Sequence, residues 1–170
     1  MNAADVLHYG QRTLLGAIDG IARDEWDAPG ACGVWSMKDL VAHLASYERV
    51  LEDVLGSLLG ASATTYLDRF QAGAGFNDAE VEARRSMTVQ EILDELSAAH
   101  ERTMALIARI PEEMRRRPGT LPWYGDAYAL DDLLVYMYYG HKREHSAQIA
   151  AFRDRLRAAP QAVAQSAAAR

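Results

Sequence analysis

Residues 130–152 read LDDLLVYMYYGHKREHSAQIAAF, and this stretch decides the fold. Its large apolar residues recur at steps of three and four, which is the spacing of one face of an α-helix. The pattern predicts a helix over about residues 130–157. Its buried side is expected to carry Leu133, Leu134, Met137, Ile149, Phe152 and Leu156, with His141 and His145 in the same row.

Three more segments with the same periodicity predict long helices, over about residues 3–23, 36–60 and 88–110. Ser36 is a favourable N-cap residue, and Thr88 followed by Glu91 predicts a capping box at the start of the third of these helices. No segment shows the alternation that is typical of a strand. We therefore expect an all-α protein with the fold of a four-helix bundle.

A long crossover, residues 61–87, separates the second helix from the third. Two glycines interrupt it, and Asn77 with Asp78 is expected to cap a short helix that runs through Arg85. The connection is longer than most compact domains need. It is either a lid or the strap that lets the third helix run in the required direction.

The composition narrows the class of protein. A chain of 170 residues suits one domain, which we expect over residues 1–157, followed by a disordered Ala-rich tail over 158–170. The single cysteine excludes an internal disulfide and a CxxC zinc or redox site. A net charge of −6 argues against binding to nucleic acid or to anionic membranes. Because no apolar run approaches the ~20 residues of a membrane span and no secretory signal is visible, a cytoplasmic protein is expected.

The histidines carry the clearest chemical signal. His141 and His145 are four residues apart, so they share one face of the helix and can bind a single metal ion. His43 is expected to face inward from the second helix. Three neutral imidazoles would leave the ion's charge uncompensated and one coordination position open, which suits Zn²⁺ or Ni²⁺ as a Lewis acid. In the alternative, a plain helical scaffold, the inward histidines are only hydrogen-bonded.

Three other chemistries can be tested against the same residues. The stretch HKREH, residues 141–145, matches the H-x-x-E-H pattern of one zinc-peptidase class with Glu144 as general base, but those peptidases contain a sheet and far longer chains. A di-iron bundle needs a glutamate three residues before a histidine, and none is present. There is no G-x-S-x-G motif, and Cys32 is expected in a loop without a catalytic partner.

Further residues are candidates for a second layer around the metal or for the wall of a pocket: His100, Tyr47, Glu144, Trp35 and Trp123. His100 follows Leu93 and Leu96 at helical spacing, so it could face inward near the metal. Its alternative is a half-exposed position beside a neighbouring acid.

Two stretches together resemble a known family. Residues 33–48, GVWSMKDLVAHLASYE, combine a Trp-Ser helix start with a histidine seven residues after the serine, and residues 130–152 add the HxxxH pair. The stretch NDAEVEARRSMTVQEILDEL, residues 77–96, is similar in style. In this order, over about residues 5–156, they resemble the DinB-like superfamily, which includes bacillithiol transferases and mycothiol-dependent maleylpyruvate isomerases.

The resemblance implies an up-down-down-up bundle, a homodimer, and a divalent metal held by His43, His141 and His145. Members of known chemistry use the metal to activate a low-molecular-weight thiol. Our first hypothesis is therefore a metal-dependent thiol S-transferase or hydrolase acting on a small electrophilic molecule. The second is a non-catalytic stress-response bundle that binds metal or a small molecule. Neither implies DNA binding.

Overall fold

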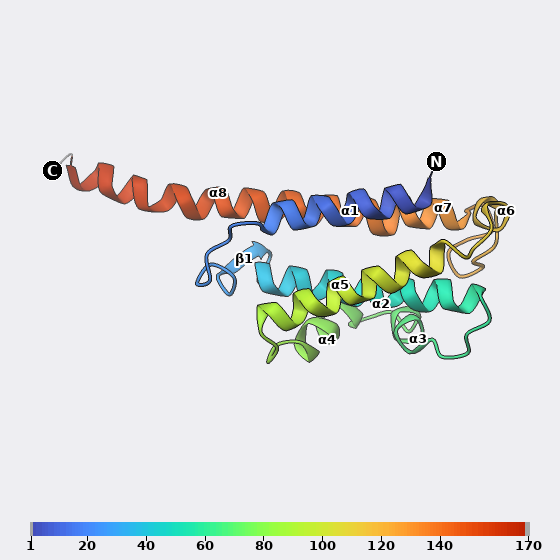
Figure 1. Cartoon of the computed structure of the whole chain (residues 1–170). Coiled ribbons are helices and arrows are strands. Elements are labelled where there is room, and N and C mark those ends of the chain that lie inside the picture. Colours follow the sequence, from blue (N-terminus) through green and yellow to red (C-terminus); the bar gives the residue numbers. More distant parts are fainter. Residues whose placement is uncertain (1, 169–170) are drawn as a thin grey trace.

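The computed structural model describes the backbone of residues 2–168 and the side chains of residues 2–158. The four long helices are α1 (Ala3–Ile18), α2 (Met37–Leu58), α5 (Val89–Ile107) and α8 (His141–Ala168). In Figure 1, α1 and α8 run side by side in one direction, whereas α2 and α5 run together in the opposite direction. This is the up-down-down-up order, so the predicted all-α four-helix bundle is confirmed.

Side-chain caps set where two of these helices begin. The Asp39 N–H donates to Ser36 Oγ at 3.1 Å, and the Ser36 N–H donates back to Asp39 Oδ2 at 2.9 Å. Thr88 and Glu91 form the same reciprocal pair at the start of α5, as the sequence predicts. In contrast, α1 ends at Ile18, short of residue 23, and the chain then turns at Gly20, whose positive φ of 70° favours glycine.

A small hairpin precedes α2, and the expectation that the chain has no strand is wrong. Strand β1 (Pro29–Cys32) pairs antiparallel with β2 (Trp35–Ser36), with Cys32 opposite Trp35. Cys32 therefore lies in a strand and not in a loop. The strands are too short to show an alternating pattern in the sequence. The hairpin leads directly into α2 and places Trp35 close to the first turns of that helix.

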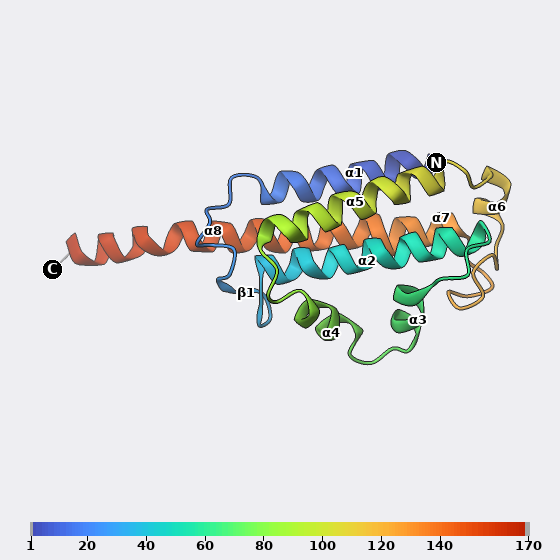
Figure 2. The same cartoon turned by 60° about the horizontal axis from the view of Figure 1, so that its bottom comes forward.

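The crossover forms two short helices, α3 (Thr65–Gln71) and α4 (Phe76–Ala83), which lie along α2 (Figure 2). Asp53 of α2 accepts the backbone N–H groups of Tyr66 and Leu67, at 2.6 and 3.1 Å. Arg84 pairs with Glu80 of α4 and Glu95 of α5, at 2.8 and 2.7 Å. The crossover is therefore tied to the bundle at both ends.

The fourth long helix differs most from its prediction. The region expected as a single helix from residue 130 begins with α7 (Leu130–Leu133) and a π-helix, η1 (Leu134–Gly140), before α8 starts at His141. The wider π-turn buries Tyr138, which is 2% exposed, and leaves Met137 only partly buried. A short helix, α6 (Glu112–Arg116), lies between α5 and α7.

Some expectations stay predictions. The helix α8 continues to Ala168, but side chains beyond residue 158 and the last two residues lie outside the described part of the chain, so the boundary between a 1–157 domain and a 158–170 tail is untested. The homodimer is also untested. Within the described residues, no helix combines the length and the apolar character that crossing a bilayer requires.

Candidate metal centre

Two elements bring three histidines to one point. His43 lies on the second turn of α2, 2% exposed, and His141 and His145 lie on the first turns of α8. The π-helix η1 ends at the residue before His141. Such π-turns frequently accompany functional sites because they change which side chains face the core. The structure therefore brings together the three histidines that the sequence predicts.

The three rings meet through the same ring nitrogen. His141 Nε2 lies 3.0 Å from His43 Nε2 and 2.8 Å from His145 Nε2. One nitrogen from each ring lies within 4.8 Å of the other two. We call these residues the three-histidine cluster, and they could hold a metal ion.

Gln148 determines which nitrogen of His145 is free. Gln148 Oε1 lies 2.8 Å from His145 Nδ1, and an amide oxygen can only accept, so Nδ1 carries the proton. The Nε2 atom then keeps its lone pair and points into the cluster. A hydrogen bond of this kind from the outer nitrogen is the usual support of a metal-bound histidine. His43 Nδ1 is buried without a partner.

Two rings of the three-histidine cluster, those of His43 and His141, strongly favour the neutral form. Burial, followed by the neighbouring His141 and His145, lowers the pKa of His43 to about 3. Burial and His145 lower the pKa of His141 to about 4, against the opposing effect of the Met137 backbone. These imidazoles are therefore unprotonated near neutral pH, which is the form that binds metals.

Hydrogen bonds alone do not satisfy the cluster. A neutral His141 with a proton on Nε2 can donate it fully to only one of its two close neighbours, and His145 Nε2 can only accept. At least one short nitrogen–nitrogen contact thus has no hydrogen of its own. A cation among the three nitrogens would satisfy all of them, so the residues fit a divalent metal with nitrogen ligands.

Two aromatic residues from the predicted set pack on the cluster. The Tyr47 ring centroid lies 4.7 Å from that of His43 and 4.5 Å from that of His141. The Trp35 centroid lies 5.1 Å from that of His43. Burial raises the pKa of Tyr47, so its hydroxyl stays protonated and can donate. The Tyr47 hydroxyl lies 3.3 Å from Asn77 Oδ1 of the crossover.

The other candidates lie away from the three nitrogens. Trp123 packs on Phe70, with ring centroids 6.1 Å apart, and Phe70 in turn packs on Tyr47. Glu144 is exposed on α8. His100 is buried on α5, where its Nδ1 lies 3.5 Å from Glu48 Oε2, at the long limit for a hydrogen bond.

The sequence interpretation missed a second buried polar group. Glu48 is fully buried, and Lys142 donates hydrogen bonds to Glu48 Oε1 and to Gln11 Oε1. With His100 these residues form what we call the Glu48–Lys142 cluster. Burial alone would raise the pKa of Glu48, but Lys142 and His100 outweigh it and lower the pKa to about 2. A visible signal was the position of Glu48 between Leu44 and Leu51 on the apolar stripe of α2.

Comparison with protein families now adds to this geometry. Residues 7–134 match the model of the mycothiol maleylpyruvate isomerase N-terminal domain. The chain belongs to this family. It is a DinB-like family of metal-binding domains, so the resemblance seen in the sequence is confirmed. The match includes His43 but ends before His141 and His145, so those two rest on the geometry. No curated protein and no solved structure shows significant similarity to the chain.

Proposed function

We propose that this protein is a metal-dependent enzyme. Its three-histidine cluster would hold zinc or nickel, and the metal would activate a small thiol or a water for attack on a small electrophile. The observation that carries the proposal is the convergence of three imidazoles on one point through Nε2.

The residues in and around the three-histidine cluster would each have a separate role. His43, His141 and His145 would hold a divalent ion through neutral nitrogens, and the charge of that ion would lower the pKa of a thiol or water bound to it. His43 and His141 bind without first losing a proton because their pKa values are low. Gln148 orients His145 through its Nδ1 proton. The rings of Trp35 and Tyr47 pack on the His43 ring and hold it in place.

The sulfur of a thiol reaction would come from a co-substrate. Cys32, the single cysteine, is half-buried in β1 and is not part of the three-histidine cluster. The family's name refers to mycothiol, which makes mycothiol the first co-substrate to test. A zinc or nickel site of this kind favours thiolate ligands strongly enough to lower their pKa.

Metal content and thiol transfer test the proposal in sequence. Protein purified without a histidine tag is expected to hold about one zinc or nickel ion per chain, and His141→Ala is expected to hold almost none. His8→Ala is the matched control, because it removes an exposed histidine outside the cluster. Mycothiol, bacillithiol and glutathione are then each assayed with a fluorogenic bimane electrophile.

The two steps have separate outcomes. A wild-type protein without metal would contradict the metal site. Full metal content with no thiol turnover and no ester hydrolysis above the level of His141→Ala would contradict catalysis. That second result would favour the non-catalytic bundle that binds metal or a small molecule.

A further inference from the structure

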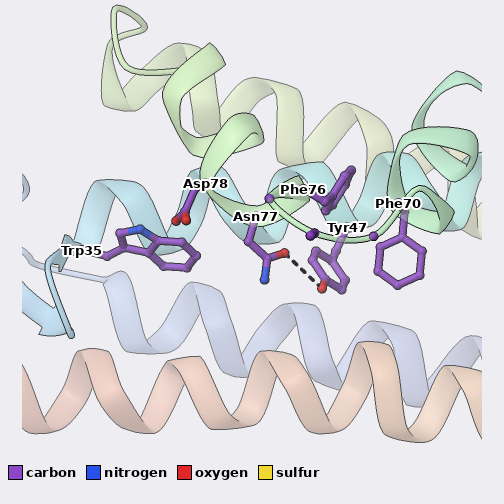
Figure 3. Close-up of a pocket in the computed structure, with 9 residues that line it drawn as sticks. Trp35, Tyr47, Phe70, Phe76, Asn77 and Asp78 are labelled. Carbon is purple, nitrogen blue, oxygen red and sulfur yellow. Dashed lines mark hydrogen bonds between the residues drawn. The ribbon is translucent and has the colours of Figure 1, made fainter.

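A pocket of about 530 Å³ lies between the start of α2 and the crossover, and two of its lining residues, Trp35 and Tyr47, pack on the three-histidine cluster. Figure 3 shows Trp35 on one side and Tyr47 with Phe70 and Phe76 on the other, with Asn77 between them. The volume is in the range of sites for small organic molecules. Four of the nine residues that line it are aromatic, and they come from four different elements.

Trp35 and Tyr47 connect the pocket to the histidines. Each of them lines the pocket, and each packs on the His43 ring, at 5.1 and 4.7 Å between centroids. Phe70 and Phe76 extend the apolar wall from Tyr47, at 5.7 and 5.9 Å. A molecule that reacts at the cluster can therefore place its body against these rings.

The residues that line the pocket carry negative charge and no positive charge. Asp78 is its only ionisable acid or base apart from the Tyr47 hydroxyl, and no lysine or arginine lines it. The crossover does carry arginines, but Arg69 and Arg84 stack on the ring of Tyr66 and pair with Glu80. An anionic group in the pocket would find no cationic partner and would face the Asp78 carboxylate.

We propose that this pocket receives the uncharged, aromatic or branched apolar body of the substrate, and that Asp78 disfavours anionic substrates. The inference rests on the proposed function and names the class of small molecule, thiol or electrophile, whose body that site accepts. The inference also disfavours maleylpyruvate, the compound in the family's name, as a substrate of this chain. Maleylpyruvate is a dicarboxylate, and no lysine or arginine lines the pocket.

Two matched thiols test the proposal by binding. Phenylmethanethiol is neutral apart from its sulfur, and 4-(mercaptomethyl)benzoate adds one carboxylate to the same ring. Each is titrated into the cobalt-loaded protein, and the thiolate-to-cobalt absorption reports binding through sulfur. The neutral thiol is expected to bind about tenfold more tightly, because the carboxylate must be desolvated without a partner.

Substitutions at Asp78 isolate its contribution. Asp78→Asn is expected to improve binding of the carboxylate thiol about threefold, as for two charges separated by several ångströms near water, and to leave the neutral thiol unchanged. Asp5→Asn is the matched control, because both aspartates are exposed and lie in the first turn of a helix.

Failure of the pocket and failure of the metal site look different. Equal or tighter binding of the carboxylate thiol, or an equal effect of Asp5→Asn, would overturn the inference. No cobalt absorption with either thiol would contradict the proposed function instead. The pocket is then tested in the metal-free protein, where quenching of Trp35 fluorescence must still favour the neutral thiol.

Discussion

Two polar clusters join α2 to α8, and they offset the cost of burial in opposite ways. In the three-histidine cluster, His43 of α2 meets His141 of α8 and the rings lose their charge. One turn further along α2, Glu48 meets Lys142, and both keep their charges as an ion pair. The two clusters use neighbouring residues of α8. Only in the three-histidine cluster do the ring nitrogens converge with too few hydrogens to form a hydrogen bond at each close contact.

The difference separates a structural role from a chemical one. The charged cluster contains its own counter-charge, so it needs no further ion. The neutral cluster has three nitrogens within reach of one point and no opposite charge among them, which leaves room for a cation. The two clusters should therefore respond differently to substitution, to pH and to metal.

The largest effect is expected from breaking the ion pair. Lys142→Met should lower the free energy of unfolding by about 3–5 kcal/mol, because it leaves the Glu48 carboxylate buried and unpaired. Adding Glu48→Leu should recover at least half of that loss. Urea denaturation measures both, with Arg85→Met as a control that removes an exposed ion pair. If Lys142→Met were as stable as the control Arg85→Met, the Glu48–Lys142 ion pair would not be buried as described.

A smaller effect is expected from pH, and it should involve the histidines alone. Between pH 7 and pH 5 the unfolded chain protonates its histidines, whereas folded His43, with a pKa of about 3, stays neutral. Stability of the metal-free protein should therefore fall with pH, by about 2 kcal/mol from His43 alone.

The sign is the same for the Glu48 carboxylate, whose folded-state pKa is also lowered, but the loss of stability lies at lower pH. The lowered pKa of Glu48 contributes stability that is complete above its ordinary value of 4.5 and is lost only as the pH falls toward about 2. Urea denaturation at pH 7 and pH 5 should then show a shallower pH dependence in His43→Gln and an unchanged one in Glu48→Gln. The reverse pattern would contradict the assignment of the neutral and the charged cluster.

The smallest effect concerns the support of His145. Gln148→Leu removes the acceptor of the Nδ1 proton, and zinc affinity should fall by about tenfold with little change in melting temperature. Competition with a chromogenic chelator measures the affinity. Gln90→Leu, which removes an exposed glutamine whose side chain donates to Asp94, is the control and should bind zinc as the wild type does. Equal affinities would show that Gln148 does not orient the ligand.

Local signals in the sequence predicted the helices well where caps and breakers are strong. Ser36 and Thr88 begin helices as expected, because their side chains satisfy free N–H groups within one turn. The hairpin of β1 and β2, over residues 29–36, was missed because two short strands carry no measurable period. The π-helix was missed because its register depends on packing against α1 and not on its own composition.

The candidate metal ligands were predictable because they too depend on a local pattern: helical spacing places His141 and His145 on one face of a helix. The pocket was not predictable from spacing. Phe70, Phe76 and Asp78 come from a crossover whose path over α2 depends on the capping by Asp53 and on the Arg84 ion pairs. The partner of Glu48 was equally hidden, because Lys142 lies 94 residues away on another helix.

The sequence by itself determined the four long helices, their amphipathic faces and the residue types able to bind a metal, because these depend on local periodicity and capping. The tertiary structure alone decided that three Nε2 atoms meet and that the buried Glu48 forms an ion pair with Lys142. It also decided that the aromatic pocket lies next to Trp35 and Tyr47, which pack on His43. Each of these depends on the relative position of helices that are far apart in the chain. That position is set by the packing of whole faces, which local patterns do not specify.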